Sequence, residues 1–252
     1  MLEINEIFGP TIQGEGKLVG SPSVFIRFGK CNFKCEGFAV EYETPSGVKK
    51  CACDTYYAVD TEFKDTWTKY KSYEEIVNEV DKLISIYPYN YKIDIVITGG
   101  EPLLYWNKEE FQKLLEHYIN AGHKVTIETN ASLNLNIDKE YQKELLFSMS
   151  VKLSNSLEPI KKRININTLN TILNNTKESY LKFVIGKDFL NDAKKEINEI
   201  LSLIPKCDVY LMPLGDTAEQ INKNCEDVIN MSIENGFKYC DRLHIRVWDN
   251  KR

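Results

Sequence analysis

Hydrophobic and polar positions change period repeatedly along the chain, which predicts helices and strands in alternation. Short apolar runs predict strands at residues 24–28, 93–98, 124–129, 148–153, 180–185 and 208–212. Apolar positions spaced three and four apart predict helices at residues 72–87, 108–121, 190–203 and 217–234. Residues 242–248 have an alternating pattern, and we predict the final strand there.

Two helix boundaries carry their own signals. Ser72 is followed three residues later by Glu75, which predicts a capping box at the start of the first helix. Gly122 follows the second helix in the position of a C-terminal cap.

Strands that are apolar throughout and alternate with helices predict a parallel sheet covered by helices, hence an α/β fold. Six or seven such units are too few to close an eight-stranded barrel, so we predict a partial, open β/α barrel. Functional side chains are then expected where strands end and loops begin. The chain shows no repeat, low-complexity tract or linker, which favours a single domain over residues 1–252.

Composition and charge argue against two classes of function, nucleic-acid binding and membrane association. The 252 residues are 42% hydrophobic and 27% charged, as in ordinary soluble proteins, and the net charge is −5. A basic excess is usual in proteins that bind nucleic acid, so this class is disfavoured. No apolar run reaches the roughly 18–20 residues that cross a bilayer, and the N-terminus does not resemble a signal peptide. We therefore expect no membrane association and a cytoplasmic protein.

Four of the seven cysteines lie in one short window, which indicates a metal site rather than disulfides. Cys31 and Cys35 are separated by three residues, and Cys51 and Cys53 follow after an insert. The insert at residues 36–52 contains Pro45-Ser46-Gly47, a turn sequence, and we interpret it as a hairpin that brings the two pairs of thiols together.

The cysteines alone leave two kinds of site open. Four thiolates complete the tetrahedral coordination of a structural zinc ion. Alternatively, three cysteines hold a 4Fe–4S cluster, and its fourth iron stays open for a ligand. Spacing does not decide between them.

A second motif favours the iron–sulfur cluster over the zinc site. Thr98-Gly99-Gly100-Glu101-Pro102 follows an apolar strand; its glycines allow close backbone approach, and its carboxylate can accept from an ammonium group. Together with the upstream cysteines it resembles the radical S-adenosylmethionine superfamily, in which this motif holds the methionyl amine. Cys31 and Cys35 match the first half of the superfamily's Cys-x3-Cys-x2-Cys signature, whereas the third cysteine is displaced by the insert.

The N-terminal region resembles one family of that superfamily, the 7-carboxy-7-deazaguanine synthases. The matching segments are Glu6–Phe8, Gln13–Gly16, Gly20–Pro22, Phe25–Phe28, Cys31-Asn32 and Cys53–Thr55. Shorter matches follow at residues 128–130, 152–154, 182–184 and 243–244, so that the resemblance extends over nearly the whole chain.

The resemblance implies a reaction and its cofactors. The family converts 6-carboxy-5,6,7,8-tetrahydropterin into 7-carboxy-7-deazaguanine with loss of ammonia, in queuosine and 7-deazapurine biosynthesis. A reduced 4Fe–4S cluster cleaves S-adenosylmethionine, and the resulting radical takes a hydrogen atom from the pterin. Mg²⁺ assists by binding the substrate carboxylate. A homodimer and a flavodoxin or ferredoxin as electron donor are also implied.

The resemblance also implies the site residues. The implied substrate contacts are Ile12, Gln13, Gly14, Glu15, Arg27, Thr98 and His244, and Thr55 is the implied Mg²⁺ ligand. The implied S-adenosylmethionine contacts are Gly99, Gly100, Glu101, Asn130, Ser154, Asn155, Ser156, Met212, Pro213, Leu214 and Gly215. The cluster ligands are Cys31, Cys35 and Cys53, because Asp54-Thr55 follows Cys53 as in the family. Cys51 is then a bystander or a fourth ligand.

The residue types suit these roles. An arginine such as Arg27 can pair with a carboxylate through two hydrogen bonds, and a threonine hydroxyl is a hard oxygen ligand for Mg²⁺. One departure is Ser154-Asn155-Ser156, where the family commonly has Ser-Pro-Lys. We interpret His117, His123 and the three remaining cysteines as structural.

Two other functions stay open at this point. A glycyl-radical-enzyme activase shares the cysteine and Gly-Gly-Glu-Pro signatures, although it does not account for Gln13–Gly16 or Arg27. A zinc-stabilised module without catalysis accounts for the cysteines but not for Thr98–Pro102.

Overall fold

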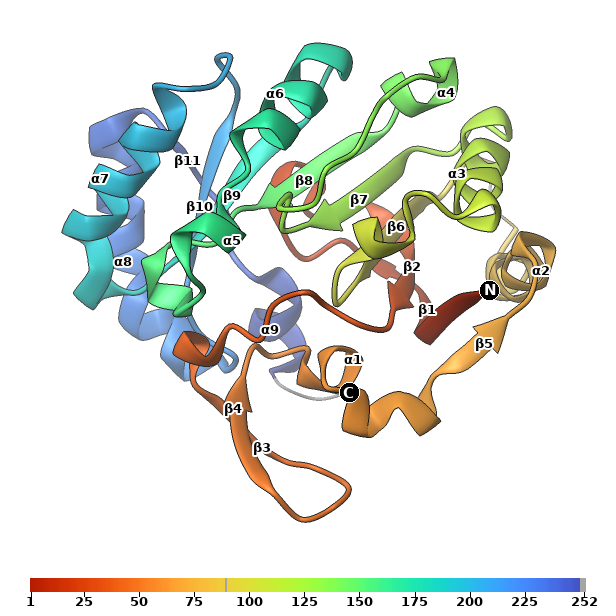
Figure 1. Cartoon of the computed structure of the whole chain (residues 1–252), viewed down its shortest axis with the longest axis horizontal. Helices are drawn as coiled ribbons and strands as arrows, with labels where there is room; N and C mark the ends of the chain where they lie inside the picture. Colours follow the sequence, from red (N-terminus) through yellow and green to blue (C-terminus); the bar gives the residue numbers. More distant parts are fainter. Residues whose placement is uncertain (89, 250–252) are drawn as a thin grey trace.

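A single nine-stranded sheet organises the chain (Figure 1), whose computed structural model describes residues 1–88 and 90–249. The strand order is β11–β10–β9–β8–β7–β6–β2–β1–β5. The strands of this sheet are β1 (Leu2–Ile12), β2 (Pro22–Phe28), β5 (Thr68–Tyr70), β6 (Asp94–Gly99), β7 (Val125–Thr129), β8 (Leu146–Ser150), β9 (Tyr180–Ile185), β10 (Val209–Pro213) and β11 (Lys238–Tyr239).

The sheet confirms the predicted fold class. β2 and the strands from β6 to β11 pair in parallel, whereas β1 is antiparallel to both β2 and β5. Within residues 1–88 and 90–249, no pairing joins the edge strands β11 and β5, so the sheet is open. The carboxyl ends of the parallel strands consequently lie along one edge, where α/β folds place their functional loops.

Amphipathic helices cover one face of the sheet. The helices are α1 (Tyr56–Val59), α2 (Tyr73–Ile84), α3 (Glu109–Asn120), α4 (Glu140–Lys143), α5 (Ile160–Arg163), α6 (Ile166–Asn175), α7 (Leu190–Leu201), α8 (Ala218–Asn235) and α9 (Leu243–Trp248). The longer ones, α2, α3, α6, α7 and α8, lie around the periphery of the molecule (Figure 1). Their apolar stripes and alternate strand residues form the main core, in which Phe111, Phe147 and Phe183 are completely buried.

The predicted elements occur with shifted ends. The strand expected at residues 148–153 runs from Leu146 to Ser150. The helices expected to end at residues 87, 121 and 203 end at Ile84, Asn120 and Leu201, and the one expected to end at residue 234 ends at Asn235. α2 begins after Ser72, but the capping box does not form, because Glu75 Oε2 accepts from Lys71 N (3.0 Å) instead. Gly122 follows α3 with a φ of 84°, as a C-terminal cap requires.

The predicted final strand at residues 242–248 is wrong. Residues Leu243–Trp248 form α9, and the last strand is the short β11. Of the alternating apolar residues, Ile245 is buried while Val247 is 57% exposed, so the segment does not present one buried strand face. Leu243 N donates to Gly14 O (2.9 Å), which anchors α9 against the N-terminal region.

The predicted hairpin in the cysteine insert is present. β3 (Val40–Glu43) and β4 (Lys49–Ala52) form a separate antiparallel pair in which Val40 faces Ala52. The hairpin leaves the body of the molecule beside α1 (Figure 1). Tyr42 stacks on Tyr56 with ring centroids 4.2 Å apart, and Lys50 pairs with Asp60 (2.8 Å). The insert is therefore fixed to the segment that follows it.

Candidate active site

The sheet face opposite the helices, here called the inner face, carries a row of polar side chains near the strand ends. Register aligns Arg27 of β2 with Thr98 of β6, and Ser150 of β8 with Lys182 of β9. Between them, Glu128 of β7 accepts from Thr98 Oγ1 at 2.7 Å. Residues paired in adjacent strands share a face, so the row is contiguous across the sheet.

Gln13 lies over this row. Its side chain is only 5% exposed, and its Nε2 donates to Glu128 Oε1 at 3.1 Å. The Glu128 carboxylate therefore receives one hydrogen bond from Gln13 and one from Thr98. Two of the predicted substrate contacts, far apart in sequence, are thus brought together by a third residue.

Glu15 is the centre of an ionic cluster. Its carboxylate lies 2.5 Å from Lys182 Nζ and 3.0 Å from Arg242 Nε, and His244 Nε2 is 3.8 Å away. Burial opposes ionisation, yet Lys182 and Arg242 hold the pKa of the Glu15 carboxyl far below its usual range. Glu15 is consequently ionised at neutral pH.

His244 reaches the same place from α9. Burial lowers the pKa of its imidazole, although Glu15 acts in the opposite direction. A neutral ring at physiological pH follows from that direction, so His244 can both donate and accept a hydrogen bond. His244 lies beside Glu15, another predicted substrate contact, but on a helix rather than on the predicted strand.

Glycines in the Gln13–Gly16 segment are required by close contacts. A Cβ at Gly14 would lie 2.1 Å from His244 Nδ1, and one at Gly16 would lie 2.0 Å from the Tyr180 hydroxyl. Gly16 N also donates to the buried Cys240 Sγ at 2.7 Å. Ile12, which ends β1, precedes this segment and pairs with Pro22.

Arg27 is held by aromatic and acidic neighbours. Its guanidinium carbon lies 5.5 Å from the ring centroid of Phe8 and 5.8 Å from that of Tyr57. Arg27 Nε donates to Glu6 Oε1 at 2.7 Å. Burial opposes its charge, but Tyr57 and Glu6 raise the pKa of Arg27 above its usual value. The side chain is a fixed cation beside the inner face.

Three of the clustered cysteines lie near one another. Cys31 and Cys35 occupy the loop after β2, and Cys53 follows β4 directly. They are close enough that Cys53 contributes to raising the pKa of both other thiols. Burial is the largest cause in each case, and it raises the pKa of Cys35 to about 12. Metal coordination is what favours thiolates in such a place.

Cys51 differs from these three. It lies on β4 opposite Glu41, and its side chain is exposed, whereas Cys35 is buried. Its neighbour in the strand, Ala52, faces the other side and is buried. This arrangement agrees with Cys53 rather than Cys51 as the third ligand, which stays a prediction.

Gly99 and Gly100 join the cysteine loop to β6. A Cβ at Gly99 would lie 2.1 Å from Phe28 O, and one at Gly100 would lie 2.0 Å from Lys30 O. Gly100 N donates to Phe28 O (3.0 Å), and Glu101 N donates to Lys30 O (2.8 Å). The close approach that these glycines allow is between two backbone segments of this chain.

Glu101 is completely buried and accepts three hydrogen bonds. The donors are Leu103 N (2.9 Å), Thr129 Oγ1 (2.6 Å) and Asn130 N (2.7 Å). Burial raises the pKa of the carboxyl despite these donors. Its direct contact with the methionyl amine stays a prediction; the visible role is to connect the ends of β6 and β7.

The remaining predicted S-adenosylmethionine contacts also lie at strand ends. Asn130 Nδ2 donates to Asn32 Oδ1 in the cysteine loop at 2.9 Å. Ser154–Ser156 form a 3₁₀ turn after β8, and a Cβ at Gly37 would lie 2.1 Å from Asn155 O. Met212 and Pro213 end β10, and Leu214 and Gly215 follow it; the carbonyl of Gly215 accepts from Arg242 Nη1.

Backbone strain gathers in the same loops. Six residues other than glycine have a positive φ among those described, and five surround the cysteines: Lys30, Cys35, Ala39, Ala131 and Leu157. Such conformations cost on the order of 1 kcal/mol each or more and persist at sites where the surroundings enforce them. Such a concentration is typical of functional sites.

Thr55 is the N-cap of α1, next to the cysteines. Its hydroxyl lies 3.3 Å from Cys53 Sγ. The predicted magnesium contact is therefore close to the predicted cluster ligand, and its role stays a prediction.

Comparison with known proteins identifies the family. The Radical SAM superfamily profile matches residues 26–228. The 7-carboxy-7-deazaguanine synthase of Rhodopirellula baltica is 30% identical over 256 residues, covering 95% of this chain and 84% of that protein. The chain belongs to the 7-carboxy-7-deazaguanine synthase family. The synthase of Halobacterium salinarum is 29% identical and covers 99% of this chain and 91% of its own length.

Solved structures give the same fold. The crystal structure of QueE from Escherichia coli aligns with a TM-score of 0.63 at 20% identity, covering 96% of this chain and 94% of that one. Streptococcus suis SuiB bound to S-adenosylmethionine aligns with a TM-score of 0.51 at 15% identity, covering 84% of this chain and 48% of that one.

Family membership decides between the two classes of protein that the cysteines alone left open, a radical SAM enzyme and a zinc-stabilised module. The chain is a radical SAM enzyme, not a non-catalytic zinc module. Among the described residues, no three histidine, cysteine or acidic side chains converge enough to hold a single metal ion. A four-iron cluster takes each cysteine on a different iron, so its ligands need not meet at one point. The neighbouring thiols of Cys31, Cys35 and Cys53 fit this requirement.

Three residues that hold the predicted substrate contacts in place were not predicted from the sequence. Glu128 and Lys182 lay within family-like segments, and Arg242 precedes the Leu243-His244 match. All three bind predicted substrate contacts. A polar residue on an otherwise apolar strand, as at Lys182, was the available signal.

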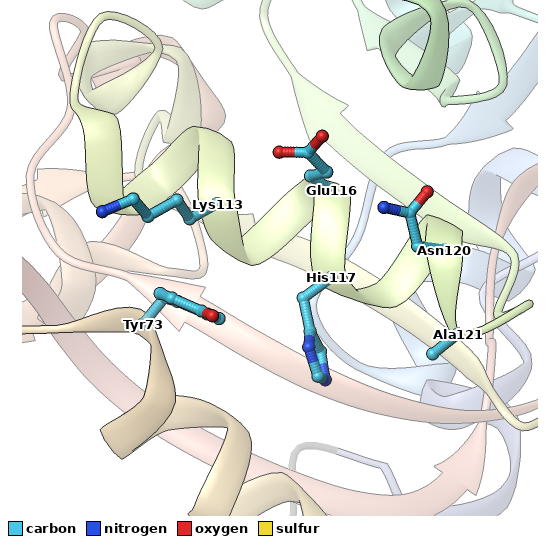
Figure 2. A pocket seen from close by; sticks show the side chains of 6 residues that line it. All are labelled: Tyr73, Lys113, Glu116, His117, Asn120 and Ala121. Atoms are coloured by element: carbon cyan, nitrogen blue, oxygen red, sulfur yellow. The ribbon is translucent and has the colours of Figure 1, made fainter.

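A surface hollow lies elsewhere in the molecule. Tyr73 of α2 and Lys113, Glu116, His117, Asn120 and Ala121 of α3 and its C-cap line it (Figure 2). These residues belong to the helix layer and not to the strand ends. His123 Nδ1 donates to Ile93 O (2.7 Å), which agrees with its structural interpretation. Within the described residues, no helix is both long and apolar enough to span a membrane.

Proposed function

We propose that this chain converts 6-carboxy-5,6,7,8-tetrahydropterin into 7-carboxy-7-deazaguanine with release of ammonia, as a step of queuosine and 7-deazapurine biosynthesis. The observation that carries the proposal is the inner-face group of Gln13, Glu15, Thr98 and Glu128, in a member of the synthase family. The group offers amide, carboxylate and hydroxyl functions, which suit the donor and acceptor edge of a pterin.

The charged residues have separate roles in this proposal. Glu15 is kept ionised by Lys182 and Arg242, so that it accepts hydrogen bonds from the N–H groups of the pterin ring. Arg27 uses Nε for Glu6, and its terminal NH₂ groups are proposed to bind the substrate carboxylate. Neutral His244, beside Glu15, orients the ring from the α9 side.

The cofactors are proposed to lie at the strand ends. Cys31, Cys35 and Cys53 would hold the 4Fe–4S cluster, and the segments 99–101, 130, 154–156 and 212–215 would hold S-adenosylmethionine. When bound, the two together supply the radical that removes a hydrogen atom from the substrate. The protein's contribution is to bind and orient the pterin and to exclude water from the buried inner face.

Further parts of the proposal follow the family resemblance. Thr55, beside Cys53, would contribute one oxygen ligand to Mg²⁺, whose other ligands would include the substrate carboxylate and water. We also propose a homodimer, a flavodoxin or ferredoxin as electron donor, and a cytoplasmic location. No feature of the chain favours the glycyl-radical activase over this function.

The test is an anaerobic assay of the reconstituted protein. S-adenosylmethionine, 6-carboxytetrahydropterin, dithionite and Mg²⁺ are supplied, and 7-carboxy-7-deazaguanine is followed by mass spectrometry. Arg27→Gln should lower kcat/KM about 100-fold, because a charge-assisted pair of hydrogen bonds to the substrate is lost. Lys113→Gln, in the helix layer, is the matched control and should leave the rate unchanged.

Two results would contradict the proposal. Cleavage of S-adenosylmethionine by a fully loaded cluster, without any product, would mean that the pterin is not the substrate. Product formation by Arg27→Gln at the wild-type kcat/KM would remove the assigned role of Arg27.

A further inference from the structure

One guanidinium connects three segments of the candidate site. Arg242 Nε donates to Glu15 Oε1 (3.0 Å), Nη1 to the carbonyl of Gly215 (2.5 Å) and Nη2 to Asp54 Oδ2 (2.5 Å). The acceptors lie 227, 27 and 188 residues away in sequence. Each of the three guanidinium nitrogens therefore binds a different part of the chain.

The three acceptors have different proposed partners. Glu15 belongs to the substrate segment, Asp54 follows the predicted cluster ligand Cys53, and Gly215 ends the last predicted S-adenosylmethionine segment. Arg242 itself is the N-cap of α9, two residues before His244. A single side chain thus lies where the substrate, cluster and cofactor segments meet.

The hydrogen bonds of Arg242 join charged side chains that are largely buried. The Arg242 side chain is 11% exposed and that of Glu15 is 13% exposed. Burial opposes the charge of Arg242, but Asp54 and Glu15 raise its pKa further above the usual value. A lysine could not replace it fully, because an ammonium is a point charge and lacks the planar fork of donors.

We propose that Arg242 is a positioning residue that fixes Glu15 relative to Asp54 and Gly215, so that the substrate is held in register with the cluster and the cofactor. Arg242 acts through Glu15 and need not touch the substrate. This inference rests on the proposed function, because it takes the pterin as the ligand of Glu15.

The test compares three full-length variants: Arg242→Gln, Arg242→Lys and Arg246→Gln. Arg246 lies one turn further along α9 and pairs with Asp241 (3.0 Å) outside the ionic cluster, which makes it a matched control. The first measurement is the Kd of 6-carboxytetrahydropterin by anaerobic calorimetry, and the second is the split between kcat and KM in the reconstituted enzyme.

The expected results are distinct. Arg242→Gln should weaken pterin binding about 30-fold or more, as truncating one member of a buried charge pair does. Arg242→Lys should recover part of this loss, because it restores the charge without the fork. Arg246→Gln should bind within a factor of two of the wild type.

A third measurement, the NMR titration of His244, needs neither substrate nor cluster. The chain has three histidines, so the NMR signal of His244 can be assigned with a His244→Gln variant. Its titration responds to the groups that face it, namely Glu15, Arg242, Asp54 and Glu128. Arg242→Gln should raise the pKa of His244, since a positive charge is removed from its surroundings.

The outcomes separate the two proposals. Wild-type Kd and wild-type His244 titration in folded Arg242→Gln would overturn the positioning role, even if the variant melts at a lower temperature. If that variant does not fold, a wild-type Kd in Arg242→Lys overturns the positioning role, because lysine keeps the charge but lacks the planar fork of donors. If the wild type does not bind the pterin at all, the proposed function fails, and the His244 titration alone decides whether Arg242 organises the site.

Discussion

Replacing Glu15 by glutamine should reveal how strongly the inner-face ionic cluster depends on a buried charge. The amide keeps the shape of the side chain but leaves Lys182 with its ammonium, only 5% exposed, beside a neutral group. Removing one partner of a buried ion pair costs about 3–5 kcal/mol. For a protein of this size, each kcal/mol lowers Tm by roughly 2–4 °C, so the drop should be at least about 6 °C.

The pH dependence of this loss has a defined sign. The folded-state pKa of Glu15 is depressed, so its stabilisation is fully present above the unfolded value of about 4.3. It is lost as pH falls from there toward the folded value. The difference in the free energy of unfolding between wild type and Glu15→Gln should therefore be constant near neutrality and shrink below about pH 4.

Urea unfolding of the single variants and of the double variant Glu15→Gln/Lys182→Met provides the assay. The double variant should be more stable than Glu15→Gln, because it no longer buries an unpaired ammonium. A loss below about 1 kcal/mol in Glu15→Gln, the usual limit for an exposed pair, would refute the reasoning. So would a double variant whose loss equals the sum of the two single losses.

Two further predictions concern the loops around the cysteines. Gly100→Ala should destabilise the protein by about 3 kcal/mol in urea unfolding, because its Cβ would lie 2.0 Å from Lys30 O. Gly186→Ala is the control, since its nearest contact would be 3.5 Å away; equal losses in the two variants would contradict the steric argument. Cys53→Ser should lose cluster iron and sulfide on reconstitution, whereas Cys51→Ser, altered at an exposed thiol, should retain both. Iron loss in Cys51→Ser alone would reverse the ligand assignment.

The parallel core could be predicted because its strands carry their signal locally. Runs such as Ile93–Thr98 and Tyr180–Ile185 are apolar almost throughout, and burial on both faces of a parallel sheet demands that composition. β1 was not predicted, since Asn5, Glu6 and Gly9-Pro10 interrupt its apolar positions. It is stabilised instead by pairing with β2 and β5.

The C-terminal segment shows how a local pattern can mislead. Leu243, Ile245 and Val247 alternate as in a strand, yet the backbone is helical, with Arg246 N donating to Arg242 O (3.1 Å). The conformation here is determined by the contact of α9 with the Gln13–Gly16 segment, to which Leu243 N is hydrogen-bonded. This contact joins residues more than 200 positions apart. Tertiary contacts override propensity in so short an element.

The candidate site also has a part that local motifs predicted and a part that depends on tertiary contacts. Gln13, Glu15, Arg27 and Thr98 were proposed from family-like motifs, and the structure brings all four to one face of the sheet or directly over it. Their partners could not be derived, because each pairing depends on strand order. Lys182 reaches Glu15 across 167 residues of sequence, and no local pattern encodes that distance.

The hairpin insert separates the length of the cysteine motif from its geometry. Val40 and Ala52 face each other at the base of the ladder, so the distance between Cys35 and Cys53 is set there and not by the residues beyond. Insertions or deletions at the Pro45–Gly47 tip would extend or shorten the ladder without moving either thiol. The number of residues between Cys35 and Cys53 can consequently vary while the distance between the two thiols stays the same. The hairpin tip, which points away from the body of the molecule (Figure 1), is thus a place where a reporter group can be inserted.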